Sequence, residues 1–118
     1  MRAAQQVIYQ NKDFIQGALI IGGWDPYKGS QLYNVTLGGS VFKTDNAWSG
    51  SGSVFISGLL KKEYHPNMTK AQITDFLRSA ISLATYRDTS SGGNINMMCI
   101  TANGAERTPY FYNEHPYK

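Results

Sequence analysis

The clearest pattern of hydrophobic and polar positions lies in the second half of the chain. Apolar residues recur there at intervals of three and four positions, at Ile73, Phe76, Leu77, Ala80, Ile81 and Ala84. This spacing places them on one face of a helix. Thr69 and Gln72 fit a capping box, in which the threonine hydroxyl accepts a backbone N–H and the glutamine side chain reaches back. The pattern predicts a helix over residues 70–86 with one buried stripe.

Strand patterns precede this helix. Residues 18–24 form a short continuous apolar run, which predicts a buried strand. A turn at residues 25–29 follows, in which proline fixes φ and glycine supplies the exit. Residues 31–37 then alternate with a period of two, Gly38-Gly39 interrupts them, and residues 40–43 resume the pattern. Together these segments predict an antiparallel meander.

The remaining segments complete the order of elements. Residues 53–64 fit either a strand or a helix, and the loop of small residues before them favours the helix, which His65-Pro66 would end. Residues 94–101 and 105–110 predict a hairpin whose turn is Asn103-Gly104, a strong type I′ signal.

The two ends of the chain give weaker patterns. Residues 2–12 predict the end of a helix without an N-cap, and the aromatic tail at 110–117 is expected to pack against a neighbour or to fray. Strands and helices that come in runs, without strict alternation, indicate an α+β fold in which helices cover antiparallel sheet. A length of 118 residues favours one domain.

Charge and cysteine content exclude several classes of function. The net charge is +3, and Lys61-Lys62 is the only adjacent basic pair, which is too little clustering for a nucleic-acid or membrane-surface partner. No apolar run approaches the roughly 20 residues of a membrane span. Cys99 is the single cysteine, so no internal disulfide is possible, and its apolar surroundings predict a buried, inert thiol. The two histidines are too far apart along the chain to suggest a zinc site.

Two loops rich in small polar residues are the candidates for chemistry. Residues 49–53 read Ser-Gly-Ser-Gly-Ser and could hold a phosphate at a helix N-terminus, or form only a flexible turn. Residues 86–93 combine Asp88 with three hydroxyls and two glycines. Asp88 is a candidate general base or orienting acid, or a loop acid that binds its own backbone. Neither loop contains an obvious nucleophile with its base.

Taken together, these segments resemble the C-terminal half of a proteasome core-particle beta subunit. The resemblance is closest to the caspase-like catalytic type, and Ala84-Thr85-Tyr86-Arg87-Asp88 also resembles the chymotrypsin-like type. The matching pieces occur in the family's order over nearly all of residues 1–110. They are Gly22-Gly23-Trp24-Asp25-Pro26 with Gly29, Leu37-Gly38-Gly39, Gly50-Ser51-Gly52-Ser53 leading to Gly58, the capped helix, Arg87-Asp88-Thr89-Ser90-Ser91-Gly92-Gly93, and Gly104-Ala105-Glu106-Arg107.

This resemblance implies a four-layer αββα N-terminal nucleophile hydrolase fold. Residues 1–118 would form a single partial domain of it, a C-terminal sandwich of antiparallel strands with covering helices. The family's nucleophile is an N-terminal threonine, which forms an acyl-enzyme with a peptide carbonyl. That threonine, its tuning lysine and acid, and the glycine N–H of the oxyanion site belong to the family's N-terminal half. The resemblance therefore implies that this chain alone is inactive.

What carries over to this chain is a supporting network. Ser51 matches the serine that binds the threonine amine, and Asp88 and Ser91 match the acid and serine that complete the network. The backbone carbonyls of Thr85, Asp88 and Ser91 match a cation site seen in the family. No other cofactor is implied. Thr89 departs from the glycine usual in the caspase-like type, and a β-branched residue there would be strained if its φ were positive.

The function implied is that of a threonine endopeptidase subunit that cleaves peptides after acidic residues during protein degradation. Its partners would be the alpha and beta subunits of stacked seven-membered rings, in the cytoplasm and nucleus. Two alternatives remain open, a non-catalytic structural ring subunit and a small phosphate-binding α+β domain. Half of a two-sheet sandwich would leave the strands at 18–24 and 94–101 uncovered, so we expect the isolated chain to be poorly soluble or oligomeric.

Overall fold

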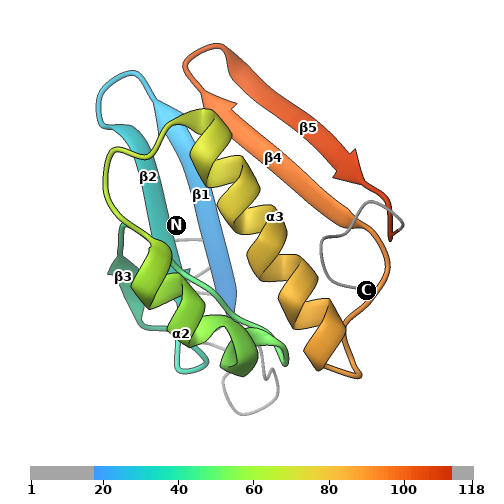
Figure 1. Cartoon of the computed structure of the whole chain (residues 1–118). Coiled ribbons are helices and arrows are strands. Elements are labelled where there is room, and N and C mark those ends of the chain that lie inside the picture. The colour runs from blue at the N-terminus through green and yellow to red at the C-terminus, as the bar shows by residue number, and fades with distance from the viewer. Residues whose placement is uncertain (1–17, 113–118) are drawn as a thin grey trace. The chain divides into compact units, whose positions relative to one another are not determined.

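A computed structural model of the chain describes residues 18–112. The helix expected at residues 2–12 and the end of the aromatic tail lie outside the described residues. Within them the elements follow the expected α+β order (Figure 1). They are β1 (Leu19–Asp25), β2 (Gly29–Val35), β3 (Val41–Lys43), α2 (Ser53–Glu63), α3 (Lys70–Arg87), β4 (Ile95–Thr101) and β5 (Gly104–Tyr110).

The described residues form two compact units. One consists of residues 18–49 with the hairpin tip at 99–106, and the other of residues 50–98 with 107–112. The strands make two separate sheets, β1-β2-β3 and β4-β5. The β4–β5 hairpin is thus shared between the two units, whereas both helices belong to the second.

The three-stranded sheet of the first unit confirms the predicted meander. β1 and β2 pair antiparallel from Leu19 opposite Val35 to Asp25 opposite Gly29, and β3 pairs antiparallel with the far end of β2. Gly29 closes the first turn with a φ of 72°, and Gly39 lies in the second with a φ of 85°. Both values belong to the left-handed region, which a residue with a Cβ adopts only at a cost.

The prediction that residues 18–24 form a buried strand is right about the strand and wrong about its burial. Leu19, Ile20 and Trp24 keep 44%, 39% and 38% of their surface exposed. The reason is that an apolar run specifies a strand but not the element that covers it, and the described part of this unit contains no helix. Val35 on β2 is fully buried. The expectation of poor solubility stays a prediction, and these exposed side chains are the surface on which it rests.

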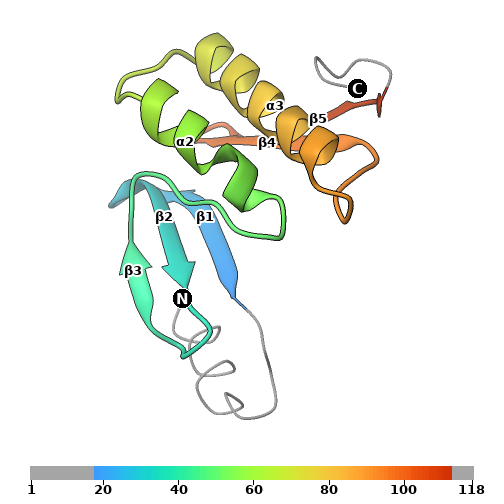
Figure 2. The ribbon, with the colours of Figure 1, turned by 60° about the horizontal axis from the view of Figure 1, so that its bottom comes forward.

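The two helices confirm the predicted boundaries closely and lie side by side in the second unit (Figure 2). The capping box of α3 is complete, because the Gln72 N–H donates to Thr69 Oγ1 over 3.1 Å and the Thr69 N–H donates to Gln72 Oε1 over 2.9 Å. The ambiguous segment at 53–64 is helical, and the extended backbone of Tyr64, with a ψ of 134°, ends α2 just before His65-Pro66.

The predicted single buried stripe of α3 needs correction. Ala80 and Ala84 are buried as expected, but Leu77 and Ile81 are 39% and 40% exposed, and Ser82 is fully buried instead. Ser82 lies one turn beyond Arg78, whose guanidinium stacks on the Tyr110 ring of β5 at 4.6 Å. α3 is therefore covered on two sides, and its apolar stripe marks only one of them.

The β4–β5 hairpin forms with a turn that differs from the prediction. Its turn residues are Ala102 and Asn103, and Gly104 opens β5 with a φ of 111°. Asn103 has no positive φ, so the turn is not type I′; its N–H donates to the Thr101 hydroxyl over 3.2 Å. A tight turn followed by a glycine of positive φ is the next most common type of hairpin connection.

Cys99 is half-buried, so the prediction of a buried core thiol is wrong. Burial alternates along β4, with Ile95 buried on the inner face and Met98 56% exposed on the other. Cys99 is on the same face as Ile95 but nearer the hairpin tip, where that face is less covered.

Candidate functional site

Asp88 joins the ends of two loops in the second unit. It is the C-cap of α3, and its N–H donates to the Ala84 carbonyl over 2.8 Å. Its Oδ2 accepts two short hydrogen bonds, each of 2.6 Å, from the hydroxyls of Ser51 and Ser91. Oxygen–oxygen distances this short are typical of hydroxyls that donate to an ionised carboxylate.

Glycines allow the loop of Ser51 to come this close. Gly50 has a φ of 104°, which turns the chain just before Ser51. A Cβ on Gly52 would lie 3.1 Å from the Ala84 Cβ, 3.2 Å from Ser91 Oγ and 3.5 Å from Asp88 Oδ2. The small-residue loop is therefore a close approach between the start of α2 and the end of α3, and a side chain at Gly52 would crowd it.

Hydrogen bonding lowers the pKa of the Asp88 carboxyl. The Ser51 hydroxyl lowers the pKa of this carboxyl most, followed by the Ser91 hydroxyl; the Ser90 N–H also lowers it, and partial desolvation opposes the shift. The carboxylate also lies beside Gly52, the N-cap of α2, where the positive end of the helix dipole favours a negative charge. α2 has no acidic residue in its own first turn, so Asp88 supplies that charge from another helix.

The structure thus brings together the three residues expected to form the supporting network, Ser51, Asp88 and Ser91. Asp88 also binds its own loop, since its Oδ1 accepts from the Ser90 N–H over 3.4 Å. The prediction that this acid binds its own backbone is therefore confirmed, and its role as a general base or orienting acid stays a prediction. The role of the network toward a threonine amine stays a prediction.

The proposed cation site at the carbonyls of Thr85, Asp88 and Ser91 also stays a prediction. The Asp88 carbonyl already accepts the Ser91 N–H over 3.2 Å, which occupies one of its two lone pairs. The Thr85 hydroxyl is turned back to the Ser82 carbonyl over 2.8 Å. Among residues 18–112, no group of three or more histidine, cysteine, aspartate or glutamate side chains could hold a metal ion.

The geometry weakens the phosphate alternative. The Ser51 hydroxyl donates to Asp88, and that carboxylate stands at the start of α2, where a phosphate would have to bind. Two anions at one helix terminus repel each other.

Thr89, the departure from the caspase-like pattern, does not have the strain that a positive φ would cause. Among the described residues, Asn67 is the only non-glycine with a positive φ.

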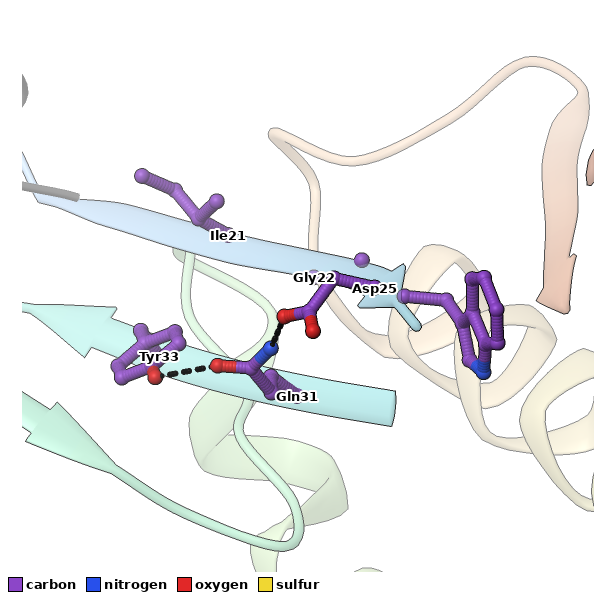
Figure 3. A pocket seen from close by; sticks show the side chains of 7 residues that line it. Ile21, Gly22, Asp25, Gln31 and Tyr33 are labelled. Atoms are coloured by element: carbon purple, nitrogen blue, oxygen red, sulfur yellow. Dashed lines mark hydrogen bonds between the residues drawn. The ribbon is translucent and has the colours of Figure 1, made fainter. Parts of the chain in front are cut away.

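Sequence reasoning missed a second polar cluster, on the first unit. Asp25 Oδ1 accepts the N–H groups of Tyr27 and Lys28 over 2.8 and 2.7 Å. Its Oδ2 accepts from the Gln31 amide, and the Gln31 Oε1 accepts the Tyr33 hydroxyl over 2.6 Å (Figure 3). The available signal was the strand period: Gln31 and Tyr33 share a face of β2, and Gln31 is diagonally across from Asp25 in the register.

This second cluster stabilises the turn between β1 and β2. The turn amides, the Lys28 N–H first, lower the pKa of the Asp25 carboxyl, together with the Gln31 side chain and the Lys28 charge. The cluster borders an open hollow of about 200 Å³ that Ile21, Gly22, Gly23 and Trp24 also line. Because the carboxylate bonds the backbone of its own turn, we assign it a structural role.

The fold and this site define a protein class. An antiparallel α+β chain with a carboxylate held between two serine loops is what the resemblance implied, and the family model described as proteasome subunit matches residues 1–100. The chain belongs to the proteasome subunit family.

Similar curated proteins are beta subunits. The chain is 41% identical to proteasome subunit beta type-6 of Dictyostelium discoideum over 103 residues, 87% of this chain and 48% of that protein. It is 41% identical to the probable proteasome subunit beta type-1 of Schizosaccharomyces pombe, over 88% of this chain and 46% of that protein. With proteasome subunit beta type-1 of Saccharomyces cerevisiae it shares 39% identity, over 94% of this chain and 52% of that protein.

The chain therefore spans about half the length of the curated relatives it matches. Within residues 18–112, no helix combines the length and the apolar character that crossing a membrane requires.

Proposed function

We propose that this chain is the C-terminal half of a catalytic proteasome beta subunit, a threonine-type endopeptidase. The observation that carries the proposal is the pair of 2.6 Å bonds from Ser51 and Ser91 to one oxygen of Asp88. They join two loops that are distant in sequence, and they leave the lone pairs of both hydroxyls directed away from the carboxylate. A protonated or neutral amine beside them would find a carboxylate and two hydroxyl acceptors.

In this proposal the network holds the amine of an N-terminal threonine that another segment supplies. Asp88 is ionised at neutral pH, as an aspartate ordinarily is, and its lowered pKa keeps it so in more acidic solution; it therefore balances positive charge on the amine. Ser51 and Ser91 fix the position of that amine, which in turn places the threonine hydroxyl for attack on a peptide carbonyl. The residues of this chain position the threonine nucleophile, and none of them acts as the nucleophile itself.

The finer assignment follows from the resemblance. We propose cleavage after acidic residues, as in the caspase-like type, with the other alpha and beta subunits of stacked seven-membered rings as partners. We further propose that the subunit works in the cytoplasm and nucleus. The alternative is a structural ring subunit without catalysis. Retention of the full Ser51–Asp88–Ser91 geometry favours the catalytic reading, because a structural subunit has less need of it.

A complementation experiment tests the proposal. The chain is co-expressed with the N-terminal half of a beta type-6 subunit that begins at its threonine, and hydrolysis of a fluorogenic peptide with glutamate before the scissile bond is measured. We expect activity only when both halves are present. Asp88→Asn should lower kcat on the order of 10²-fold, because the nucleophile loses its position. Asp45→Asn, which removes an exposed acid of the other unit, is the matched control.

Two outcomes would reject the proposal. Activity that Asp88→Asn leaves unchanged would show that the network does not position the nucleophile. Assembly of both halves without any hydrolysis would favour the structural subunit. The coding sequence upstream of this chain gives an independent check, since a threonine directly after a glycine, followed by the family's acid and lysine, is required for catalysis.

A further inference from the structure

A hollow on the helical unit lies outside the Ser51–Asp88–Ser91 network. It has a volume of about 450 Å³ and is formed by the last turns of α2, the link to α3, and the first half of α3. Its lining residues are Leu59, Glu63, His65, Met68, Gln72, Asp75, Phe76 and Ser79. None of them belongs to the candidate site described above.

The lining is sorted by polarity. Leu59, Met68 and Phe76 are half-buried, whereas Glu63, His65, Gln72 and Asp75 are exposed. An apolar floor under a polar rim is the arrangement found where a partner's side chain is received, because the floor excludes water and the rim fixes orientation.

The charges on the rim select the occupant. Glu63 and Asp75 are both acidic, and no lysine or arginine lines the hollow. Lys61 and Lys62, in the same last turn of α2, are exposed and lie outside the lining, so the acids are the formal charges that face the hollow itself. Glu63 is the last residue of α2, where a negative charge faces the negative end of the helix dipole. An acid at that position does not serve its own helix, whereas it would pair with an arriving cation.

We propose that this hollow is a docking site for an arginine or lysine side chain carried by a partner polypeptide. The aliphatic stem of such a side chain lies on Leu59, Met68 and Phe76, and its charged head reaches Glu63 and Asp75 at the rim. Long basic side chains combine these two features, an apolar stem and a cationic end. The site is independent of the proposed peptidase activity, which depends on the opposite ends of the two helices.

Peptide binding to the full 118-residue chain tests the proposal. The chain is immobilised, so that self-association does not interfere, and is probed with a blocked pentapeptide that has one central arginine. The control peptide has citrulline in its place, which keeps the shape and removes the charge. We expect weak binding of the arginine peptide, at least about fivefold tighter than the citrulline peptide and weakened by added salt.

Two variants locate the binding. Glu63→Gln combined with Asp75→Asn should remove the preference for arginine, while Asp45→Asn, an exposed acid elsewhere, should leave it intact. Met68→Lys should block the peptide, because a lysine of the chain itself then occupies the floor. Circular dichroism shows whether the helices persist; both rim acids are exposed, so their replacement does not disturb packing.

Three outcomes would overturn the proposal. Equal binding of both peptides would make the occupant apolar, and arginine preference that survives the double variant would place binding elsewhere. The third is binding of the free chain itself to the immobilised chain, lost in the double variant, while neither peptide binds. That result would make a second copy the occupant.

Discussion

Two carboxylates of this protein are held by hydrogen bonds in opposite ways. Asp25 accepts from the backbone N–H groups of Tyr27 and Lys28 and from the Gln31 side chain, so all of these partners lie within six residues of it. Asp88 accepts from Ser91 in its own loop and from Ser51, which lies 37 residues earlier. The pKa of both groups is lowered. A lowered pKa alone therefore does not mark a functional site. Asp25 is bonded within a single turn, whereas Asp88 bonds a residue distant in sequence and so forms a junction between the loop before α2 and the loop after α3.

The largest effect on stability should come from adding a side chain at Gly52, in the junction between the start of α2 and the end of α3. Gly52→Val would place side-chain atoms against Ala84 and Ser91, and overpacking of this kind costs about 1–3 kcal/mol. Gly58→Ala is the matched control, because a Cβ there meets nothing within 4 Å and alanine favours the helix by about 0.5–1 kcal/mol. Chemical denaturation of both variants measures the difference. Equal stabilities would mean that the two loops do not meet as described.

A second experiment compares the partners of the two acids. Ser51→Ala should raise the pKa of Asp88 more than Ser91→Ala does, since the Ser51 hydroxyl is the larger cause of its lowering. Neither change should move the pKa of Asp25, whose partners are all on the first unit. NMR titration of the two carboxyl carbons reads both values in one sample. A joint shift of both acids would break the distinction between turn and junction.

Low pH should weaken the hydrogen-bond clusters of both Asp25 and Asp88. Each carboxyl has a folded-state pKa below its ordinary value of 3.8, so its contribution to stability is present above that pH and is lost as the pH falls through the lowered pKa. Unfolding midpoints measured between pH 5 and pH 2 should decline most steeply below 3.8. Asp88→Asn and Asp25→Asn should each flatten part of this decline, and additivity of the two would show that the clusters titrate independently.

The smallest effect is expected at Thr89. Its φ is not positive, so Thr89→Gly relieves no strain and lowers stability by only about 0.4–1 kcal/mol, through the greater freedom of the unfolded chain. Thermal unfolding measures the change. A gain in stability would show that the threonine distorts the loop after all.

The same contrast between local and distant partners explains what could be predicted from the sequence. The cap of α3 at Thr69 and Gln72 and the turn after Asp25 were predictable, because their hydrogen bonds span only a few residues. The exposure of β1 and of Leu77 and Ile81 was not, because burial depends on which element covers a face. The hairpin turn was misplaced by one residue because a glycine after asparagine also fits a type I turn followed by a residue of positive φ.

The candidate site shows the limit most clearly. No spacing rule connects Ser51 with Asp88; their meeting was expected only because the order of motifs resembled a known family. Gln31 and Tyr33 were not predicted to bond with Asp25, although they are two positions apart and so share a face of the strand that pairs with β1. Cross-strand neighbours become visible only after the register is known.

Asp88 ends one helix and stabilises the start of another, which has a consequence for how this region opens. α2 has no side-chain cap of its own, so its first turn depends on a charge that arrives only when α3 has formed to its last residue. The beginning of α2 and the end of α3 should therefore exchange their amide hydrogens together, as one cooperative unit. Fraying, which usually proceeds separately at each helix terminus, is here shared by two termini that a single carboxylate joins.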